Sequence, residues 1–138
     1  MPIKVVIDTN IYISAVFWQG KPRKVVDLGR TQDIQIFTST EIEDEISEKL
    51  QTKFKLSRAE ADRIMFDFST FTIPLSIKKK HRVVIDDPDD DKFIDCAMAC
   101  GADFIITGDK HLLKLQEYMG IKVVKAAEFL AQQFPFIE

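Results

Sequence analysis

The sequence predicts a three-layer α/β/α fold with a mostly parallel central sheet. Two observations support this fold class. Apolar runs alternate with helical patterns along the chain. The runs IKVVI and FIIT are continuous rather than alternating, which is typical of strands buried on both faces. The chain has 138 residues, of which 46% are hydrophobic. It is therefore expected to form a single domain over residues 1–138.

The expected elements alternate between strand and helix, and each has a local reason. They are, in order, strand 3–8, helix 11–17, helix 22–31, strand 34–38, a helix after Thr40, a helix after Ser57, strand 72–77, extended segment 83–85, helix 88–100, strand 104–107, helix 109–118, strand 121–124 and helix 126–133.

Helix starts in the first half are marked by capping residues. Pro22 suits the first turn of the helix that follows the break at Trp18-Gln-Gly. Thr40 has a glutamate three residues later, and so does Ser57, which is the spacing of a capping box. Both positions are therefore predicted to begin helices.

Proline and glycine place the boundaries in the second half. Pro74 indicates an edge or irregular strand, because proline cannot donate to a sheet. Pro88 fits a helix start, and the aspartates around it favour the positive end of the helix dipole. Gly101 ends that helix, and Gly108 allows a tight turn after the strand over 104–107.

Four acidic residues occupy positions that such a fold brings together. Asp8 ends the first strand and Asp109 follows a later one. Glu45 lies within a predicted helix, and Asp91 lies in the first turn of another. Ligands of open α/β sheets bind outside the carboxyl ends of the strands. Carboxylates gathered there repel one another unless a cation is present. Hard oxygen ligands suit Mg²⁺ or Mn²⁺, so the sequence predicts a metal-dependent enzyme.

The same segments resemble a known family. The motifs DTN after the first strand, STEIEDEISEKL around Glu45, DPDDDKF and TGDKHLL resemble the PIN domain, in particular the small prokaryotic PIN proteins of toxin–antitoxin pairs. The resemblance implies a Mg²⁺- or Mn²⁺-dependent ribonuclease acting on RNA, silenced by a protein antitoxin and forming a homodimer. Its implied catalytic residues and metal ligands are Asp8, Glu45, Asp91 and Asp109.

Alternatives remain open at two of these positions. Glu45 borders the buried stripe of its helix, and Glu41 is the fallback. Asp91 is selected by the family's spacing, and Asp90 remains an alternative.

Supporting residues are expected beside the ligands. They are Asn10, Thr107, Asp90 and Asp95. His111 is interpreted as a surface residue or a substrate contact.

RNA must be held by basic groups outside the acidic site, because the formal net charge is −3. The candidates are Lys21, Arg23, Lys24 and Lys110. Phe17 and Trp18 are candidates for stacking on an unpaired base, although Trp18 equally suits a core or a dimer interface.

Competing functions make different demands on the sequence. A non-catalytic PIN-like module would bind RNA or a protein without cleaving it. A haloacid-dehalogenase-like phosphatase needs a second aspartate where this chain has Asn10. No apolar stretch approaches a membrane span, and MPIKVV lacks the layout of a signal peptide. Cys96 and Cys100 are interpreted as reduced core thiols, so a cytoplasmic location is expected.

Overall fold

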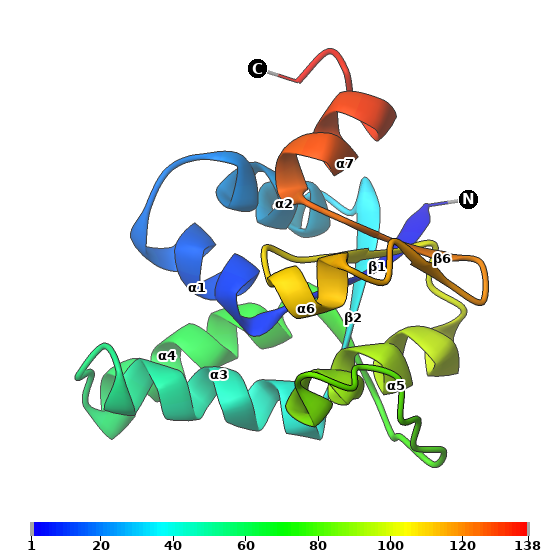
Figure 1. Cartoon of the computed structure of the whole chain (residues 1–138). Coiled ribbons are helices and arrows are strands. Elements are labelled where there is room, and N and C mark those ends of the chain that lie inside the picture. The colour runs from blue at the N-terminus through cyan, green and yellow to red at the C-terminus, as the bar shows by residue number, and fades with distance from the viewer. Residues whose placement is uncertain (1, 138) are drawn as a thin grey trace.

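A six-stranded sheet forms the centre of the computed structural model, which describes residues 2–137. The strands follow the order β3-β2-β1-β4-β6-β5 (Figure 1). They are β1 Ile3–Ile7, β2 Ile34–Ser39, β3 Thr72–Leu75, β4 Phe104–Ile106, β5 Glu117–Tyr118 and β6 Ile121–Val124. Every neighbouring pair is parallel except β5 and β6, which are antiparallel.

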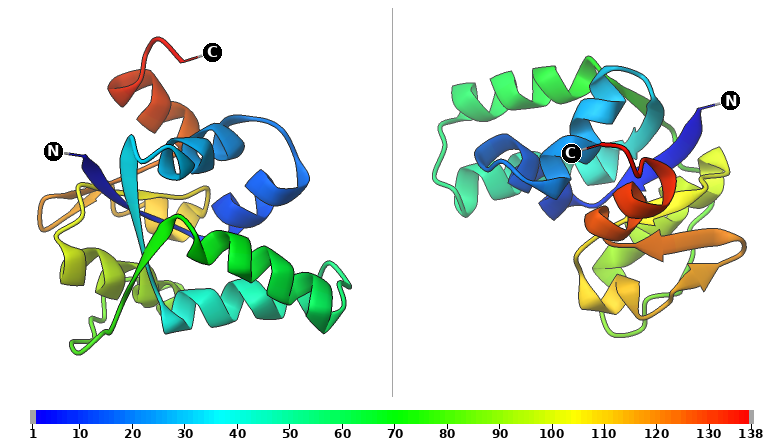
Figure 2. Two further views of the ribbon diagram at one scale, coloured as in Figure 1. Left: turned by 180° about the vertical axis from the view of Figure 1, so that it is seen from behind. Right: turned by 90° about the horizontal axis from the view of Figure 1, so that it is seen from above.

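Helices cover both faces of this sheet, which confirms the predicted three-layer fold. The helices are α1 Thr9–Phe17, α2 Lys21–Arg30, α3 Thr40–Thr52, α4 Arg58–Ser69, α5 Asp91–Cys100, α6 Lys110–Leu113 and α7 Ala126–Gln133. In Figure 1, α2 and α7 lie on one side of the sheet and α5 lies on the other. The pair α3 and α4 extends beyond the sheet, as Figure 2 shows.

The central strand β1 is buried over its last three residues. Val5 and Val6 have no exposed surface. Val5 pairs with Ile36 of β2 on one side and with Phe104 of β4 on the other. Apolar side chains on both faces of β1 therefore contact helices, which explains the continuous apolar run in the sequence.

The two predicted helix starts are capped by side chains, but one of the capping residues lies one position earlier than predicted. The Ser57 capping box is present, with the Ser57 hydroxyl accepting from the Glu60 backbone and the Glu60 carboxylate accepting from the Ser57 backbone. Helix α3 instead uses Ser39 as its cap, and the Ser39 hydroxyl accepts from the backbone of Ile42.

Three predicted segments differ most from the structure, and the strand predicted over 72–77 also ends earlier, at Leu75. Residues 83–85 are not part of the sheet, and the helix expected over 88–100 is split into a 3₁₀ turn, Pro88–Asp90, and α5. The helix expected over 109–118 ends at Leu113, because β5 and β6 form a tight hairpin. Its turn residues Met119 and Gly120 have φ of 51° and 85°. Positive φ at both turn positions matches the twist of paired strands.

Within residues 2–137, no helix combines the length and the apolar character needed to cross a membrane.

Candidate active site

Asp8 is buried at the carboxyl end of β1, and both of its carboxylate oxygens accept hydrogen bonds. Its side chain is only 3% exposed. One carboxylate oxygen accepts from the Ile11 backbone at 2.9 Å and caps α1, and the other accepts from the Thr107 hydroxyl. Burial raises the pKa of Asp8, and the nearby Asp109 adds to the rise, although the hydrogen bonds from Thr107 and Ile11 oppose it.

Thr107 joins the ends of two neighbouring strands. Its hydroxyl donates to Asp8 and accepts from the Asp109 backbone at 2.9 Å. The Asp8 backbone in turn donates to Ile106 at 3.1 Å. Asp8 and Asp109 are therefore neighbours because β1 and β4 are paired and parallel. This is the convergence that the sequence predicted for the two strand ends, and it places Thr107 beside Asp8 as expected.

Asp90 enters the same region from the 3₁₀ turn before α5. It is 8% exposed, and one of its carboxylate oxygens is buried without a hydrogen-bond partner. Burial raises the pKa of Asp90 to about 7, and the negative charges of Asp109, Asp87 and Asp8 add to the rise. Bringing these carboxylates together without a cation is therefore energetically unfavourable.

An acidic pocket of about 450 Å³ collects these side chains. It lies between the strand ends, the start of α1, α3 and the 3₁₀ turn. Its lining residues are Asp8, Thr9, Asn10, Glu45, Glu48, Lys49, Thr52, Lys53, Asp87, Asp89, Asp90, Phe93 and Asp109. The predicted residues Asp8, Asn10, Glu45 and Asp109 are therefore brought together.

Glu45 faces the pocket between two lysines. Its carboxylate bonds to Lys92 and lies 3.7 Å from the Lys49 ammonium. Burial alone would raise the pKa of Glu45, but the lysines outweigh it and the pKa is lowered. The alternative acid Glu41 pairs with Lys80 and does not line the pocket.

At one end of the pocket, four donor atoms lie close enough together to bind a single cation. One ligand atom from each of Asp87, Asp90, Asp109 and His111 is within 4.8 Å of the others. Asp87 and His111 were not predicted as ligands. The only signals in the sequence were the density of aspartates around Pro88 and the closeness of His111 to Asp109.

The sequence predicted Asp91 as a metal ligand, but the structure does not place it in the acidic pocket. Its carboxylate accepts from the backbones of Val83 and Val84, at 3.0 and 2.8 Å, and it does not line the acidic pocket. The reason is that residues 83–84 have no strand partner, so their amides need another acceptor. The 3₁₀ turn then directs Asp90, rather than Asp91, into the pocket.

Asp95 is likewise directed away from the pocket. Its carboxylate accepts from the His81 backbone at 2.6 Å and contacts the His81 ring nitrogen at 2.9 Å. The expected place of Asp95 beside the ligands is therefore also corrected. Asp91 and Asp95, one helical turn apart, fasten the preceding loop to α5.

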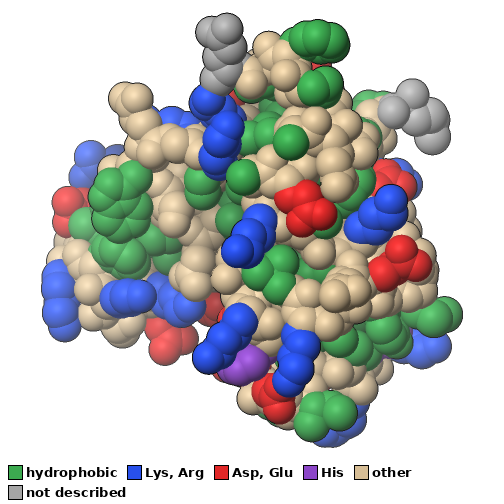
Figure 3. All heavy atoms as spheres, turned by 45° about the horizontal axis from the view of Figure 1, so that its top comes forward, with side chains coloured by type: hydrophobic (Ala, Val, Ile, Leu, Met, Phe, Trp, Pro, Cys, Tyr) green, Lys and Arg blue, Asp and Glu red, His purple; other side chains and the backbone are tan. Residues whose placement is uncertain are grey.

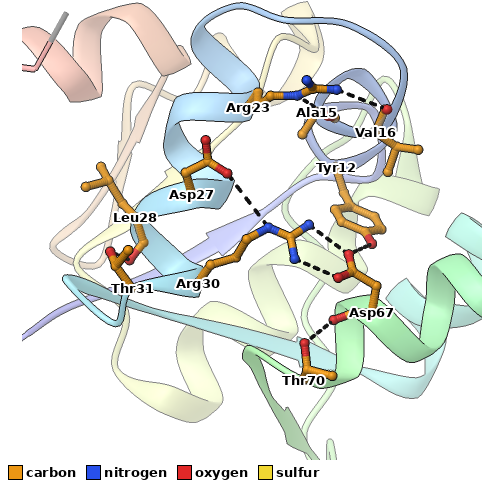
Figure 4. Close-up of polar contacts among 10 residues, drawn as sticks. All are labelled: Tyr12, Ala15, Val16, Arg23, Asp27, Leu28, Arg30, Thr31, Asp67 and Thr70. Carbon is orange, nitrogen blue, oxygen red and sulfur yellow. Dashed lines mark hydrogen bonds and ion pairs between the residues drawn. The ribbon is translucent and has the colours of Figure 1, made fainter.

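The predicted RNA-binding residues do not line the acidic pocket. Arg23 donates to Ala15 at 2.8 Å and to Val16 at 3.2 Å, so it caps the carbonyl end of α1. Figure 4 shows it pointing toward these carbonyls, above the network in which Arg30 and Tyr12 bond to Asp67.

The other predicted basic residues lie outside this pocket too. Lys21 and Lys110 are exposed and Lys24 is half-buried. The basic residues that line the pocket are Lys49 of α3 and Lys53, which follows the last residue of that helix, and neither was predicted. Lys49 lies four residues and Lys53 eight residues after Glu45, which places them on the same side of the helix, and this spacing is the signal that could have found them.

Comparison with known proteins identifies the family. The family model described as "PIN domain" matches residues 4–111. This chain belongs to the PIN domain family. Its PIN domain is 36% identical to the uncharacterized protein MJ1680 of Methanocaldococcus jannaschii, covering 98% of this chain and 94% of that protein.

Two solved structures share the fold of this PIN domain. VapBC2 of Rickettsia felis, bound to a DNA fragment from its promoter, matches with a TM-score of 0.64 and 12% identity over 88% of this chain and 97% of that chain. PAE2754 of Pyrobaculum aerophilum matches with a TM-score of 0.59 and 15% identity over 96% and 97%.

Proposed function

We propose that this PIN domain is a divalent-metal-dependent endoribonuclease that hydrolyses RNA phosphodiester bonds in the acidic pocket. The observation that carries the proposal is the buried, unpartnered oxygen of Asp90 among Asp8, Asp87 and Asp109. Such an oxygen is costly unless it has a partner, and a cation would supply one. Membership of the PIN domain family supports nuclease activity.

The donor atoms fit Mg²⁺ or Mn²⁺. Asp87, Asp90, Asp109 and His111 would hold the ion, with Asp8 adjacent. Carboxylate oxygens suit both ions, and an imidazole among them favours Mn²⁺. A divalent ion bound there would activate water and neutralise charge on the phosphate.

The chain's own residues prepare the site for an anionic substrate. Thr107 holds Asp8 and the Asp109 backbone in one arrangement. Lys92 holds Glu45 at the wall of the pocket. Lys49 and Lys53 supply positive charge at the α3 side, where a phosphate backbone would otherwise be repelled.

We further propose that the protein is the toxin of a toxin–antitoxin pair and acts in the cytoplasm as a homodimer. The shared fold with Rickettsia felis VapBC2 supports the proposed antitoxin partner. Copurification with the product of an adjoining reading frame would test the pair, and light scattering would test the dimer.

Cleavage of a labelled single-stranded RNA with and without Mg²⁺ or Mn²⁺ tests the nuclease proposal. We expect cleavage that requires metal and is lost in Asp90→Asn and Asp109→Asn but kept in Asp91→Asn. The competing proposal, a non-catalytic RNA- or protein-binding module, predicts binding without cleavage in all of these proteins. Metal-independent cleavage, or activity unaffected in Asp90→Asn, would contradict the assigned site.

A further inference from the structure

An exposed cluster of aromatic rings lies where α1 ends and α3 ends. It consists of Phe17, Trp18 and Phe54. The rings of Phe17 and Phe54 stack at 4.9 Å between centroids, and Trp18 meets both edge-on, at 5.8 and 6.3 Å. Trp18 is 57% exposed and Phe17 is 37% exposed. Trp18 therefore does not lie in the core, and no other part of the described chain covers most of its surface.

The aromatic cluster continues directly from the acidic pocket. Lys53 lines the pocket, and its ammonium lies 5.8 Å from the centroid of the Phe54 ring. Helix α3 forms the shared wall, since Glu45 faces the pocket and Lys53 follows two turns later. At 1.5 Å per residue this wall is about 12 Å long, which suits a short stretch of an extended strand.

The charges beside the cluster indicate what occupies it. Along the chain, Lys49 and Lys53 line the pocket between Glu45 and Phe54, and Lys21 and Lys55 are exposed nearby in the sequence. Figure 3 shows a hydrophobic patch at the left of the molecule, the side on which α1 ends in Figure 1, with lysine or arginine side chains beside it. Aromatic rings next to a positively charged track are the usual platform for single-stranded nucleic acid.

We propose that the aromatic cluster stacks on an unpaired base of the RNA, whose backbone passes Lys53 and Lys49 into the acidic pocket. The inference rests on the proposed nuclease function and adds to it a contact site for one unpaired base, because a paired base has no free face to offer the rings. Trp18 is the ring with the most exposed surface and therefore contributes most to the stacking.

Fluorescence offers a direct test, because Trp18 is the only tryptophan of the chain. The 138-residue chain in EDTA is titrated with a ten-nucleotide oligoadenylate, an abasic strand of the same length and a blunt RNA duplex. We expect the oligoadenylate to quench Trp18, and the abasic strand and the duplex to leave its emission nearly unchanged. Equal responses to all three would overturn the proposal.

Variants separate stacking from folding and from charge. Anisotropy of labelled oligoadenylate should show affinity about 5- to 150-fold weaker for Trp18→Ala, as expected for loss of one stacked base. Trp18→Phe should retain most of the affinity. Phe66→Ala is the matched control, since Phe66 is 73% exposed but lies on α4, outside the cluster. Identical affinities for Trp18→Ala and Phe66→Ala would refute the stacking site.

Failure of stacking is distinguishable from failure of the nuclease proposal. Metal-dependent cleavage without any Trp18 response to RNA would overturn the stacking site and leave the nuclease standing. Quenching by oligoadenylate without cleavage would support the base-stacking site and contradict the nuclease. A Trp18 response to a copurified protein, with none to RNA, would assign the cluster to a protein partner and overturn the inference.

Discussion

Replacing Asp90 by asparagine should stabilise the metal-free protein and greatly weaken its stabilisation by metal. The carboxylate of Asp90 is buried beside Asp109, Asp87 and Asp8, and one of its oxygens has no partner. Asparagine has nearly the same shape but carries no charge, so it removes the repulsion. Its amide can also donate to the neighbouring carboxylates.

The magnitude follows from the pKa of Asp90, which is raised from 3.8 to about 7. At 1.36 kcal/mol per pKa unit, ionised Asp90 costs the metal-free fold at most about 4 kcal/mol. Because the folded protein binds this proton more tightly than the unfolded chain, stability falls as pH rises from about 4 to about 7. Asp90→Asn removes this fall, so its advantage is small at pH 4 and full at pH 8.

Thermal unfolding with EDTA and with Mn²⁺ provides the assay. In EDTA at pH 8 we expect Asp90→Asn to unfold roughly 5–12 °C above the wild type. At a metal concentration 100 times Kd, the wild type should gain about 2.7 kcal/mol and the variant much less.

Asp91→Asn is the matched control, because Asp91 accepts from the backbones of Val83 and Val84 rather than facing the pocket. We expect it to lose about 1–3 kcal/mol with and without metal, and to keep the metal-induced gain. If Asp90→Asn were the less stable protein in EDTA at pH 8, or if metal stabilised it as strongly as the wild type, the reasoning would be wrong.

Three further substitutions test other parts of the structure. Thr107→Val removes the hydroxyl that joins Asp8 to the next strand end, so cleavage should fall about 10- to 100-fold and the metal titration midpoint should rise. Arg23→Ala deletes the bonds that cap α1 and should lower the free energy of unfolding by about 1–3 kcal/mol in urea titrations; an unchanged stability would return Arg23 to the RNA-binding candidates. In Gly29→Ala the new Cβ would lie 2.3 Å from the Ile36 Cδ1, so calorimetry should show a loss of about 1–3 kcal/mol.

The layers of the fold and two of the acids could be predicted from the chain alone. Continuous apolar runs indicate strands buried on both faces, and such strands lie side by side and parallel. An aspartate just beyond the carboxyl end of each of two adjacent strands must then lie at the same edge of the sheet. This reasoning placed Asp8 and Asp109 together without knowledge of any contact, and their hydrogen bonds to Thr107 show how closely the strand ends approach.

Other residues of the pocket could not be predicted, because their positions depend on contacts between segments and not on any local sequence pattern. Among the aspartates from Asp86 to Asp91, the sequence and the family spacing favoured Asp91, whereas the 3₁₀ turn directs Asp90 into the pocket. The orientation of this turn decides whether Asp90 or Asp91 faces the pocket. The backbone amides of Val83 and Val84, which have no strand partner, fix that orientation because they donate to the carboxylate of Asp91.

The same holds for the charges around the pocket. The sequence suggested that Arg23 was available to bind RNA, but in the structure Arg23 donates to the backbone carbonyls at the end of α1. Lys49 and Lys53, in contrast, line the pocket because α3 packs along it. Sequence determines which groups a segment carries and how they are spaced along it. The packing of distant segments determines which of those groups already have a partner and which remain available for chemistry.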